Sequence, residues 1–170
     1  MPLHFQAWHE TFAEYGVKCS HDFLESQAGI PAKQILENVN KKFSWDLPIQ
    51  EFSSKKRKKS LQLIPEAKAI KPICDIALHY HQKLPQAVAS GGSKESVHLI
   101  LKNIKLFDYF DEVITSDDPV SPKPSPDIFL EASRRLNVSP ENCIVFEDGE
   151  PGIVAAKKAG MHVFDVRLHL

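Results

Sequence analysis

The sequence predicts an α/β protein with a Rossmann-like, doubly wound parallel sheet and a separate helical unit in front of it. Two observations support this prediction. From about residue 67 onward, short apolar strand candidates alternate with helical segments, and no convincing strand lies before residue 85. Strands that alternate with helices are typical of a parallel sheet. We therefore expect a helical unit over residues 1–66 and an α/β core over residues 67–170.

The helical unit contains three segments with helical periodicity. The first runs from Leu3 to Glu14 and is followed by Gly16, a residue type that commonly ends a helix. Its apolar stripe consists of Phe5, Trp8, Phe12 and Tyr15. A second segment opens at residues 30–32, and a third runs from about Pro48 through a basic cluster to Leu63.

The core contains strand and helix candidates in alternation. Strands are expected at residues 87–89, 112–115, 143–146 and 161–166. Helices are expected at residues 69–82, 94–102, 127–136 and 151–159. Ligands of such sheets bind beyond the carboxyl ends of the strands, so the residues that follow the strands are the candidates for a site.

Composition argues against several classes of function. The formal net charge is −1 and no run of about 18 apolar residues occurs, so we expect neither a nucleic-acid partner nor a membrane span. The basic run over residues 55–59 favours nucleic acid when taken alone. We interpret it instead as a solvated helix face, one lysine of which could reach a phosphorylated ligand. Three widely spaced cysteines and a first stretch without signal-peptide character favour a cytoplasmic protein.

Ser90-Gly91-Gly92 follows the first strand candidate and precedes a helix. A hydroxyl and free backbone N–H groups at a helix N-terminus can bind an anion such as phosphate. The alternative is that Ser90 is only the N-cap of a tight turn into the helix.

Lys123 lies among alternating prolines in the stretch SPKPSPD. We expect these prolines to hold the loop extended and to fix the direction of Lys123, which then suits a phosphoryl group or a carboxylate. The alternative is a plain helix-entry loop with Ser125 as the cap and Pro126 in the first turn.

Glu147 and Asp148 end the apolar run CIVF and are followed by glycine. Adjacent carboxylates repel each other unless a cation or a donor compensates them, and oxygen ligands of this kind suit Mg²⁺. The alternative is a helix N-terminus that carries acids because of the helix dipole.

In chain order, Ser90, Lys123 within SPKPSPDIF, and VFEDGEPGI resemble motifs II, III and IV of the haloacid dehalogenase-like hydrolases. The resemblance covers essentially the whole chain and is greatest to the subgroup of β-phosphoglucomutase and the sugar-phosphate phosphatases, including fructose-1-phosphate phosphatase-like members. It implies phosphoryl transfer from a sugar phosphate with Mg²⁺, through an aspartyl-phosphate.

The resemblance also implies roles for individual residues. Lys123 would stabilise charge, and Ser90 and Gly91 would hold phosphate oxygens. Glu147 and Asp148 would bind Mg²⁺. The stretch PLHFQAW, with His4, resembles the segment that follows motif I, so His4 would contact the substrate. Residues 1–66 would form the α-helical cap.

One part of the family pattern is missing from the printed sequence. Motif I of the family, Asp-x-Asp-Gly-Thr at the end of the first strand, supplies the nucleophile and the general acid/base. The sequence contains no such motif and begins with Met1 where the family has just completed it. We therefore expect a sheet without its first, central strand, an incomplete Mg²⁺ site and an inactive chain as written. The strands that carry Ser90 and Glu147 would lose a ladder partner or pair directly.

Three interpretations stay open at this point. The chain is a sugar-phosphate phosphatase recorded from an internal methionine, or a non-catalytic relic that binds phosphate or a partner, or a β-phosphoglucomutase-type isomerase. The last is disfavoured because Ala32, in the cap segment that begins at Gly29, stands where the mutase has an arginine that grips phosphate. We expect a monomer or weak dimer.

Overall fold

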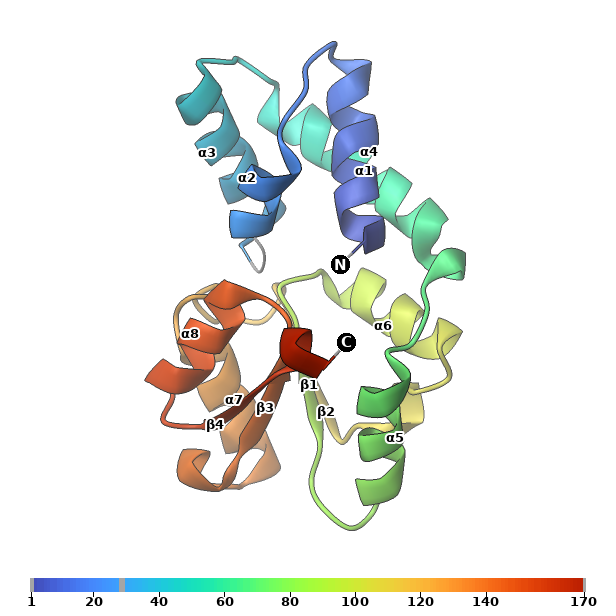
Figure 1. Cartoon of the computed structure of the whole chain (residues 1–170), viewed down its shortest axis with the longest axis vertical. Coiled ribbons are helices and arrows are strands. Elements are labelled where there is room, and N and C mark those ends of the chain that lie inside the picture. Colours follow the sequence, from blue (N-terminus) through green and yellow to red (C-terminus); the bar gives the residue numbers. More distant parts are fainter. Residues whose placement is uncertain (1, 28–29, 170) are drawn as a thin grey trace.

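The computed structural model describes residues 2–27 and 30–169, and it has two parts (Figure 1). Helices α1 to α4 pack together at one end of the molecule, and strands β1 to β4 with helices α5 to α8 form the other end. The chain passes between them through the short helix η1 (Ile64–Glu66). None of the helices within the described ranges is long and apolar enough to cross a membrane.

The helical part consists of α1 (Pro2–Glu14), α2 (His21–Ser26), α3 (Ala32–Phe43) and α4 (Ile49–Leu63). Its core is aromatic, because the stripe predicted from the sequence places Trp8 and Phe12 against Phe52, and each of these three side chains is fully buried. Gly16 follows α1 with φ 67°, a left-handed conformation that glycine adopts without strain. Helix α2 was not expected, because this six-residue helix buries a single residue, Leu24, and so shows no periodic pattern.

The α/β part follows the expected order of elements. Its helices are α5 (Lys71–Tyr80), α6 (Lys94–Asn103), α7 (Asp127–Leu136) and α8 (Glu150–Lys158). Its strands are β1 (Ala87–Ala89), β2 (Glu112–Ile114), β3 (Ile144–Glu147) and β4 (His162–Asp165). Short 3₁₀ turns η2 (Phe107–Tyr109), η3 (Pro140–Asn142) and η4 (Val166–His169) connect or follow them. All four predicted strands are confirmed, with ends that differ by one residue where they differ at all.

The strands form two parallel pairs rather than one continuous sheet. Strand β1 pairs with β2, with Ala87 opposite Glu112, and β3 pairs with β4, with Ile144 opposite His162. Between the described strands, β1 does not pair with β3. Of the two outcomes that the sequence left open, direct pairing across the gap is therefore wrong, and β1 and β3 each keep one edge without a strand partner.

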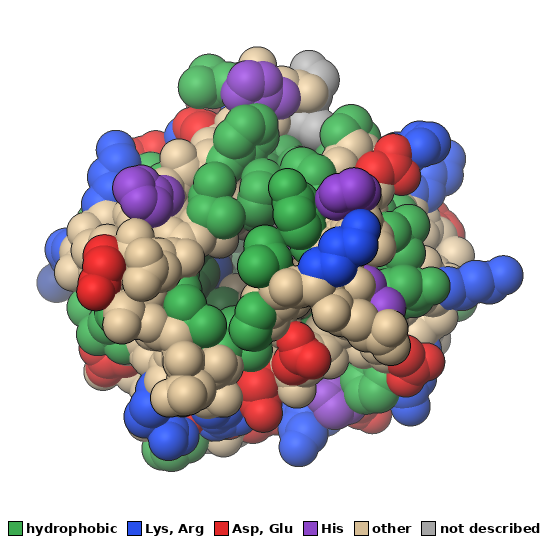
Figure 2. All heavy atoms as spheres, turned by 90° about the horizontal axis from the view of Figure 1, so that it is seen from below, with side chains coloured by type: hydrophobic (Ala, Val, Ile, Leu, Met, Phe, Trp, Pro, Cys, Tyr) green, Lys and Arg blue, Asp and Glu red, His purple; other side chains and the backbone are tan. Residues whose placement is uncertain are grey.

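The two pairs of strands share one hydrophobic cluster, in which β1 and β2 pack mainly on α7 while β3 and β4 pack mainly on α8. The shared hydrophobic cluster includes Phe129 from α7 and Ala155 from α8, with Ala89 of β1 and Val145 of β3 packed against it. The two small sheets are therefore parts of one layer that is interrupted between β1 and β3 (Figure 1). Figure 2 views the molecule from below, at the end away from α1–α4, and shows hydrophobic side chains gathered around a hollow.

Candidate functional site

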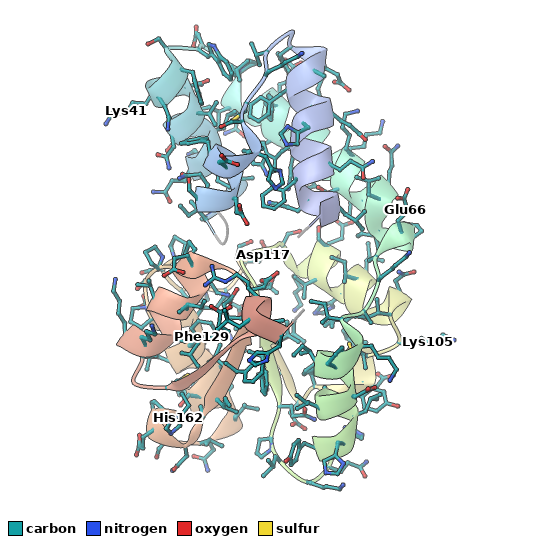
Figure 3. The ribbon with its side chains drawn as sticks, in the orientation of Figure 1. Lys41, Glu66, Lys105, Asp117, Phe129 and His162 are labelled. Carbon is teal, nitrogen blue, oxygen red and sulfur yellow. The ribbon has the colours of Figure 1, made fainter. Side chains whose placement is uncertain are left out.

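Lys123 lies in the loop between β2 and α7 and points inward. Its side chain is 7% exposed, and its Nζ donates to Glu147 Oε2 at 2.6 Å and to the carbonyl of Ala89 at 3.3 Å. The ring of Phe129, labelled in Figure 3, lies 4.8 Å from the ammonium. A buried ammonium needs such partners to offset its lost hydration. Lys123 is therefore a buried and paired side chain rather than a solvated one.

The conformation predicted for the Lys123 loop is wrong. The N–H of Ser125 donates to the carbonyl of Pro122 at 2.9 Å, so the loop closes a turn around Lys123 and is not extended. Ser125 does not cap the helix backbone either, since its hydroxyl donates to Asp127 Oδ1 at 2.8 Å and the N-cap position of α7 is Pro126.

Glu147, the last residue of β3, is held by three donors. Its Oε2 accepts from Lys123, while Oε1 accepts from the backbone N–H groups of Asp148 at 3.2 Å and Gly149 at 3.0 Å. Its carboxylate lies so close to α8 that a Cβ added at Gly152 would be 2.2 Å from Glu147 Cδ. Because Lys123 also binds Ala89, this ion pair joins the ends of β1 and β3 across the interrupted layer.

Ser90 is not the N-cap of the helix that follows it. The N-cap of α6 is Ser93, whose hydroxyl accepts from the N–H of Ser96. Ser90 Oγ instead accepts from the N–H of Gly92 at 3.2 Å, in the loop that leaves β1. The alternative of a simple N-cap at Ser90 is therefore wrong.

Ser90, Gly91 and Lys123 line one small cavity of about 40 Å³. Its other walls come from the residues that follow β2, including Thr115, and from Pro31 of the helical part. A cavity of this size holds about one water molecule. The structure thus brings together three predicted residues from two separate loops, at the carboxyl ends of β1 and β2. Gly29, the first residue of the cap segment that contains Pro31, lies outside the described residues.

Several other residues that line this cavity were not singled out from the sequence, among them Thr115. Thr115 directly follows β2 and is fully buried, with its N–H and hydroxyl donating to Asp118 Oδ2 at 2.8 and 3.1 Å. The position of Thr115 directly after a predicted strand was the feature of the sequence that could have identified it as a site residue. Pro31, the N-cap residue of α3, lies in the stretch GIPAKQIL, which by the family resemblance is a cap segment that faces the substrate.

Asp148 differs from its neighbour because its carboxylate accepts no hydrogen bond within the described residues, whereas both oxygens of Glu147 are engaged. No group of three or more His, Cys, Asp or Glu side chains in residues 2–27 and 30–169 is arranged to hold a metal. Mg²⁺ commonly takes one or two protein carboxylates and completes its shell with water and substrate phosphate. Asp148 fits this pattern directly, while Glu147 fits it only if it exchanges Lys123 for the metal.

His4 lies in α1 of the helical part and is not among the residues that line this cavity. Its Nε2 accepts from Trp8 Nε1 at 3.2 Å, and its Nδ1 is 3.0 Å from Lys56 Nζ. Burial and the neighbouring Lys56 lower the pKa of His4 from 6.5 to about 3. His4 is therefore a neutral imidazole at physiological pH.

The basic run over residues 55–59 is largely paired with acids. Lys55 contacts Glu51 at 2.9 Å, Lys59 contacts Glu14 at 2.8 Å, and Arg57 reaches Glu95 in the α/β part. Lys56 turns inward and is 7% exposed, so the interpretation of the run as a solvated face is wrong for this residue.

The sequence of this chain is similar to those of known enzymes. The family model of haloacid dehalogenase-like hydrolases matches residues 1–166. Fructose-1-phosphate phosphatase of Escherichia coli (strain K12) is 31% identical over 167 residues, which span 98% of this chain and 89% of that protein. β-Phosphoglucomutase of Bacillus subtilis (strain 168) is 28% identical, over 96% of this chain and 75% of that enzyme.

The fold is similar to that of a solved member of the same group. The crystal structure of β-phosphoglucomutase from Clostridium difficile matches with a TM-score of 0.81 at 28% identity, over 96% of this chain and 76% of that one. The relatives are thus sugar-phosphate phosphatases and phosphomutases. This chain belongs to the haloacid dehalogenase-like hydrolase family.

Proposed function

We propose that this chain binds the phosphoryl group of a sugar phosphate and serves a Mg²⁺-dependent phosphatase reaction. The observation that supports it is the convergence of Ser90, Gly91 and Lys123 on one cavity at the carboxyl ends of β1 and β2. A hydroxyl, a loop N–H and a buried ammonium are donors of the kind that bind phosphate oxygens. Thr115 completes the polar wall.

Without a ligand, Lys123 and Glu147 of the site are paired with each other. In the proposal, the anionic phosphate replaces the Glu147 carboxylate as the partner of Lys123, which keeps the ammonium compensated. Glu147 is then free to join Asp148 as an oxygen ligand of Mg²⁺. A bound Mg²⁺ would polarise the phosphoryl oxygens as a Lewis acid. The cavity is small, so a phosphate can enter only if Pro31 moves away from Ser90.

In this proposal the 170-residue chain alone binds phosphate but does not catalyse turnover. Its sequence contains no Asp-x-Asp-Gly-Thr motif, so the nucleophile that the family uses is not among these 170 residues. In the proposal, the strand that ends in that motif would lie between the edges of β1 and β3 that have no strand partner among the described residues. We infer that the chain as printed binds phosphate, and that turnover requires a strand with these carboxylates in the gap.

Hydrolysis is favoured over a mutase reaction because the first residue of α3 is Ala32, which packs against the aromatic cluster of the helical part and offers no cation to a second phosphate. The proposal includes a cytoplasmic location, in keeping with three cysteines that form no disulfide, and a monomer or weak dimer. It includes no nucleic-acid partner, since Lys55, Arg57 and Lys59 already pair with acids.

The test measures the calorimetric binding of fructose 1-phosphate and, separately, phosphate release from it with and without Mg²⁺, both with the purified 170-residue chain. We expect binding without turnover. Adding a strand peptide that ends in Asp-x-Asp-Gly-Thr is expected to produce Mg²⁺-dependent turnover, which Asp148→Asn abolishes. Turnover by the chain alone that is lost in Asp148→Asn would contradict the binding-only part of the proposal. Absence of phosphate binding would contradict all of it.

A further inference from the structure

Thr115, the fully buried residue in the wall of the cavity that contains Ser90, is held by a single carboxylate. Its N–H and its hydroxyl both donate to Asp118 Oδ2, at 2.8 and 3.1 Å. The N–H of Asp118 donates in return to the carbonyl of Thr115 at 3.2 Å. An aspartate that binds backbone groups of its own loop in this way fixes the conformation of that loop. Asp118 therefore determines the path of the loop that follows β2.

The loop after β2 also supports the loop that carries Ser90. The N–H of Ser90 donates to the carbonyl of Ile114 at 2.9 Å, and the N–H of Ser116 donates to the carbonyl of Gly92 at 3.0 Å. Ile114 and Ser116 are the two neighbours of Thr115 in the sequence. A displacement of Thr115 therefore also shifts the loop that brings Ser90 to the cavity.

Arg135 of α7 holds Asp118 in place. Its Nη2 donates at 2.5 Å to Asp118 Oδ1, the oxygen that Thr115 does not use. Its Nε donates to Glu131 Oε1 at 2.7 Å, one turn earlier on α7, and Glu112 lies farther off, at 3.6 Å from Nη1. The rigid guanidinium is thus anchored on its own helix through one nitrogen and binds the loop through another.

The pair between Arg135 and Asp118 is partly shielded from water, since the two side chains are 24% and 18% exposed. Burial alone would raise the pKa of Asp118, but the hydrogen bonds from Arg135 and Thr115 outweigh burial and hold this pKa below its usual value. Asp118 is therefore a carboxylate at physiological pH, which accepts hydrogen bonds only. Neither Asp118 nor Arg135 lines the cavity, so they can act on a bound phosphate only through Thr115 and its neighbours.

The adjacent residue Arg134 binds the same acid of α7 but not the loop. Its Nε and Nη2 donate to the two oxygens of Glu131 at 2.7 and 2.8 Å. Its side chain is 71% exposed, and among the residues that the structure describes it forms an ion pair with Glu131 alone. Two neighbouring arginines therefore share one acid, while only Arg135 is connected to the wall of the cavity.

We propose that Arg135 is a positioning residue of the phosphate site, which acts through Asp118 on Thr115 and on the loop that carries Ser90. The guanidinium does not touch the ligand. It keeps the loop after β2 in the conformation that forms the cavity wall, so the phosphate meets a preorganised site. The effect on phosphate binding rests on the proposed function, whereas the effect on the loop is a property of the free protein.

The loop is tested without a ligand by NMR-detected hydrogen exchange of the Thr115 amide. In Arg135→Met this amide should exchange about tenfold faster or more, because its acceptor Asp118 is no longer held. The matched control Arg134→Met should leave it unchanged. The amide of Ala159, which donates to the carbonyl of Ala155 in α8, should keep its wild-type rate in both variants. An unchanged Thr115 amide in Arg135→Met, or an equal acceleration at Ala159, would overturn the inference.

The effect on the site is tested by calorimetric titration of fructose 1-phosphate into the 170-residue chain. Arg135→Met and Asp118→Asn should each weaken binding by about fivefold or more, and Arg134→Met should bind like wild type. Because Arg135 acts only through Asp118, the double variant should bind no more weakly than Asp118→Asn. A merely structural role through Glu131 would add a further loss.

Additive losses in the double variant, or wild-type affinity in Arg135→Met, overturn the proposal. Absence of binding by the wild-type chain contradicts the proposed function and the ligand half of this inference. The exchange rate of the Thr115 amide then still decides whether Arg135 holds the loop.

Discussion

The contact between Gly152 and Glu147 predicts an unusual response to Gly152→Ala. Gly152 lies in the first turn of α8, where alanine is normally the better helix former. Here the added Cβ would be 2.2 Å from both Cδ and Oε2 of Glu147, well inside van der Waals contact. The Glu147 carboxylate must move, and its three donors hold it where it is: Lys123 and the N–H groups of the two residues that follow it.

The expected change in the free energy of unfolding follows from the ion pair between Lys123 and Glu147, which the added Cβ would break. Lys123 and Glu147 are 7% and 13% exposed, so separating them leaves two buried charges without compensation. Breaking such a pair costs about 3–5 kcal/mol. The gain in helix propensity from glycine to alanine is about 1 kcal/mol at most. We therefore expect Gly152→Ala to lower the free energy of unfolding by about 2–4 kcal/mol.

Urea unfolding followed by circular dichroism, in wild type and in a Glu147→Ala background, separates the two effects. Without the Glu147 side chain the Cβ has room, so Gly152→Ala should stabilise that background by up to about 1 kcal/mol. The sign of the effect therefore reverses between the two backgrounds. The same destabilisation in both would refute the reasoning, since it would show that the Glu147 carboxylate is not what excludes a side chain at Gly152.

Three further predictions concern single contacts. Lys123→Met leaves Glu147 buried and unpaired, so it should lower the free energy of unfolding in urea by about 3–5 kcal/mol. The double variant Lys123→Met/Glu147→Gln should recover at least half of that loss. Equal losses in the single and the double variant would contradict the ion pair. The unfolded chain protonates His4 near pH 6.5 but the folded one only near pH 3, so the free energy of unfolding falls as pH decreases through this window. His4→Gln should remove at most about 2 kcal/mol of the loss between pH 7 and pH 5, and an unchanged slope would contradict the neutral imidazole. Asn103→Ala removes the amide that donates to the carbonyl of Ile64 at 3.0 Å, so it should lower the free energy of unfolding by about 1 kcal/mol. No loss of stability would show that this contact does not hold η1 against α6.

The order of elements could be predicted from the sequence because each element has a local signature. The aromatic stripe of α1 has helical spacing, and the strands are short apolar runs that end at polar or glycine-rich loops. Strand ends also marked the site, since the carboxyl ends of parallel strands meet at one edge. Ser90 and Lys123 were found in this way, and both line the same cavity.

The contacts that organise the site could not be predicted, because they join residues far apart in the chain. Lys123 and Glu147 are 24 positions apart, and each looked like a ligand-binding group when considered alone. The structure shows that they compensate each other. Lys56 and His4 are 52 positions apart, and only their contact separates Lys56 from the paired lysines around it. Local propensity also misled at the Lys123 loop, where the hydrogen bond between Ser125 and Pro122 closes a turn.

The central claim, a phosphate site formed by Ser90, Gly91 and Lys123, is tested most directly by calorimetric binding of fructose 1-phosphate to the 170-residue chain and to Ser90→Ala. A hydrogen bond to a charged group contributes about 1.5–3 kcal/mol, so Ser90→Ala should weaken binding by about tenfold or more. The control Ser139→Ala, whose serine precedes η3 and makes no side-chain cap, should bind like wild type. Equal affinities for wild type and Ser90→Ala would contradict the account.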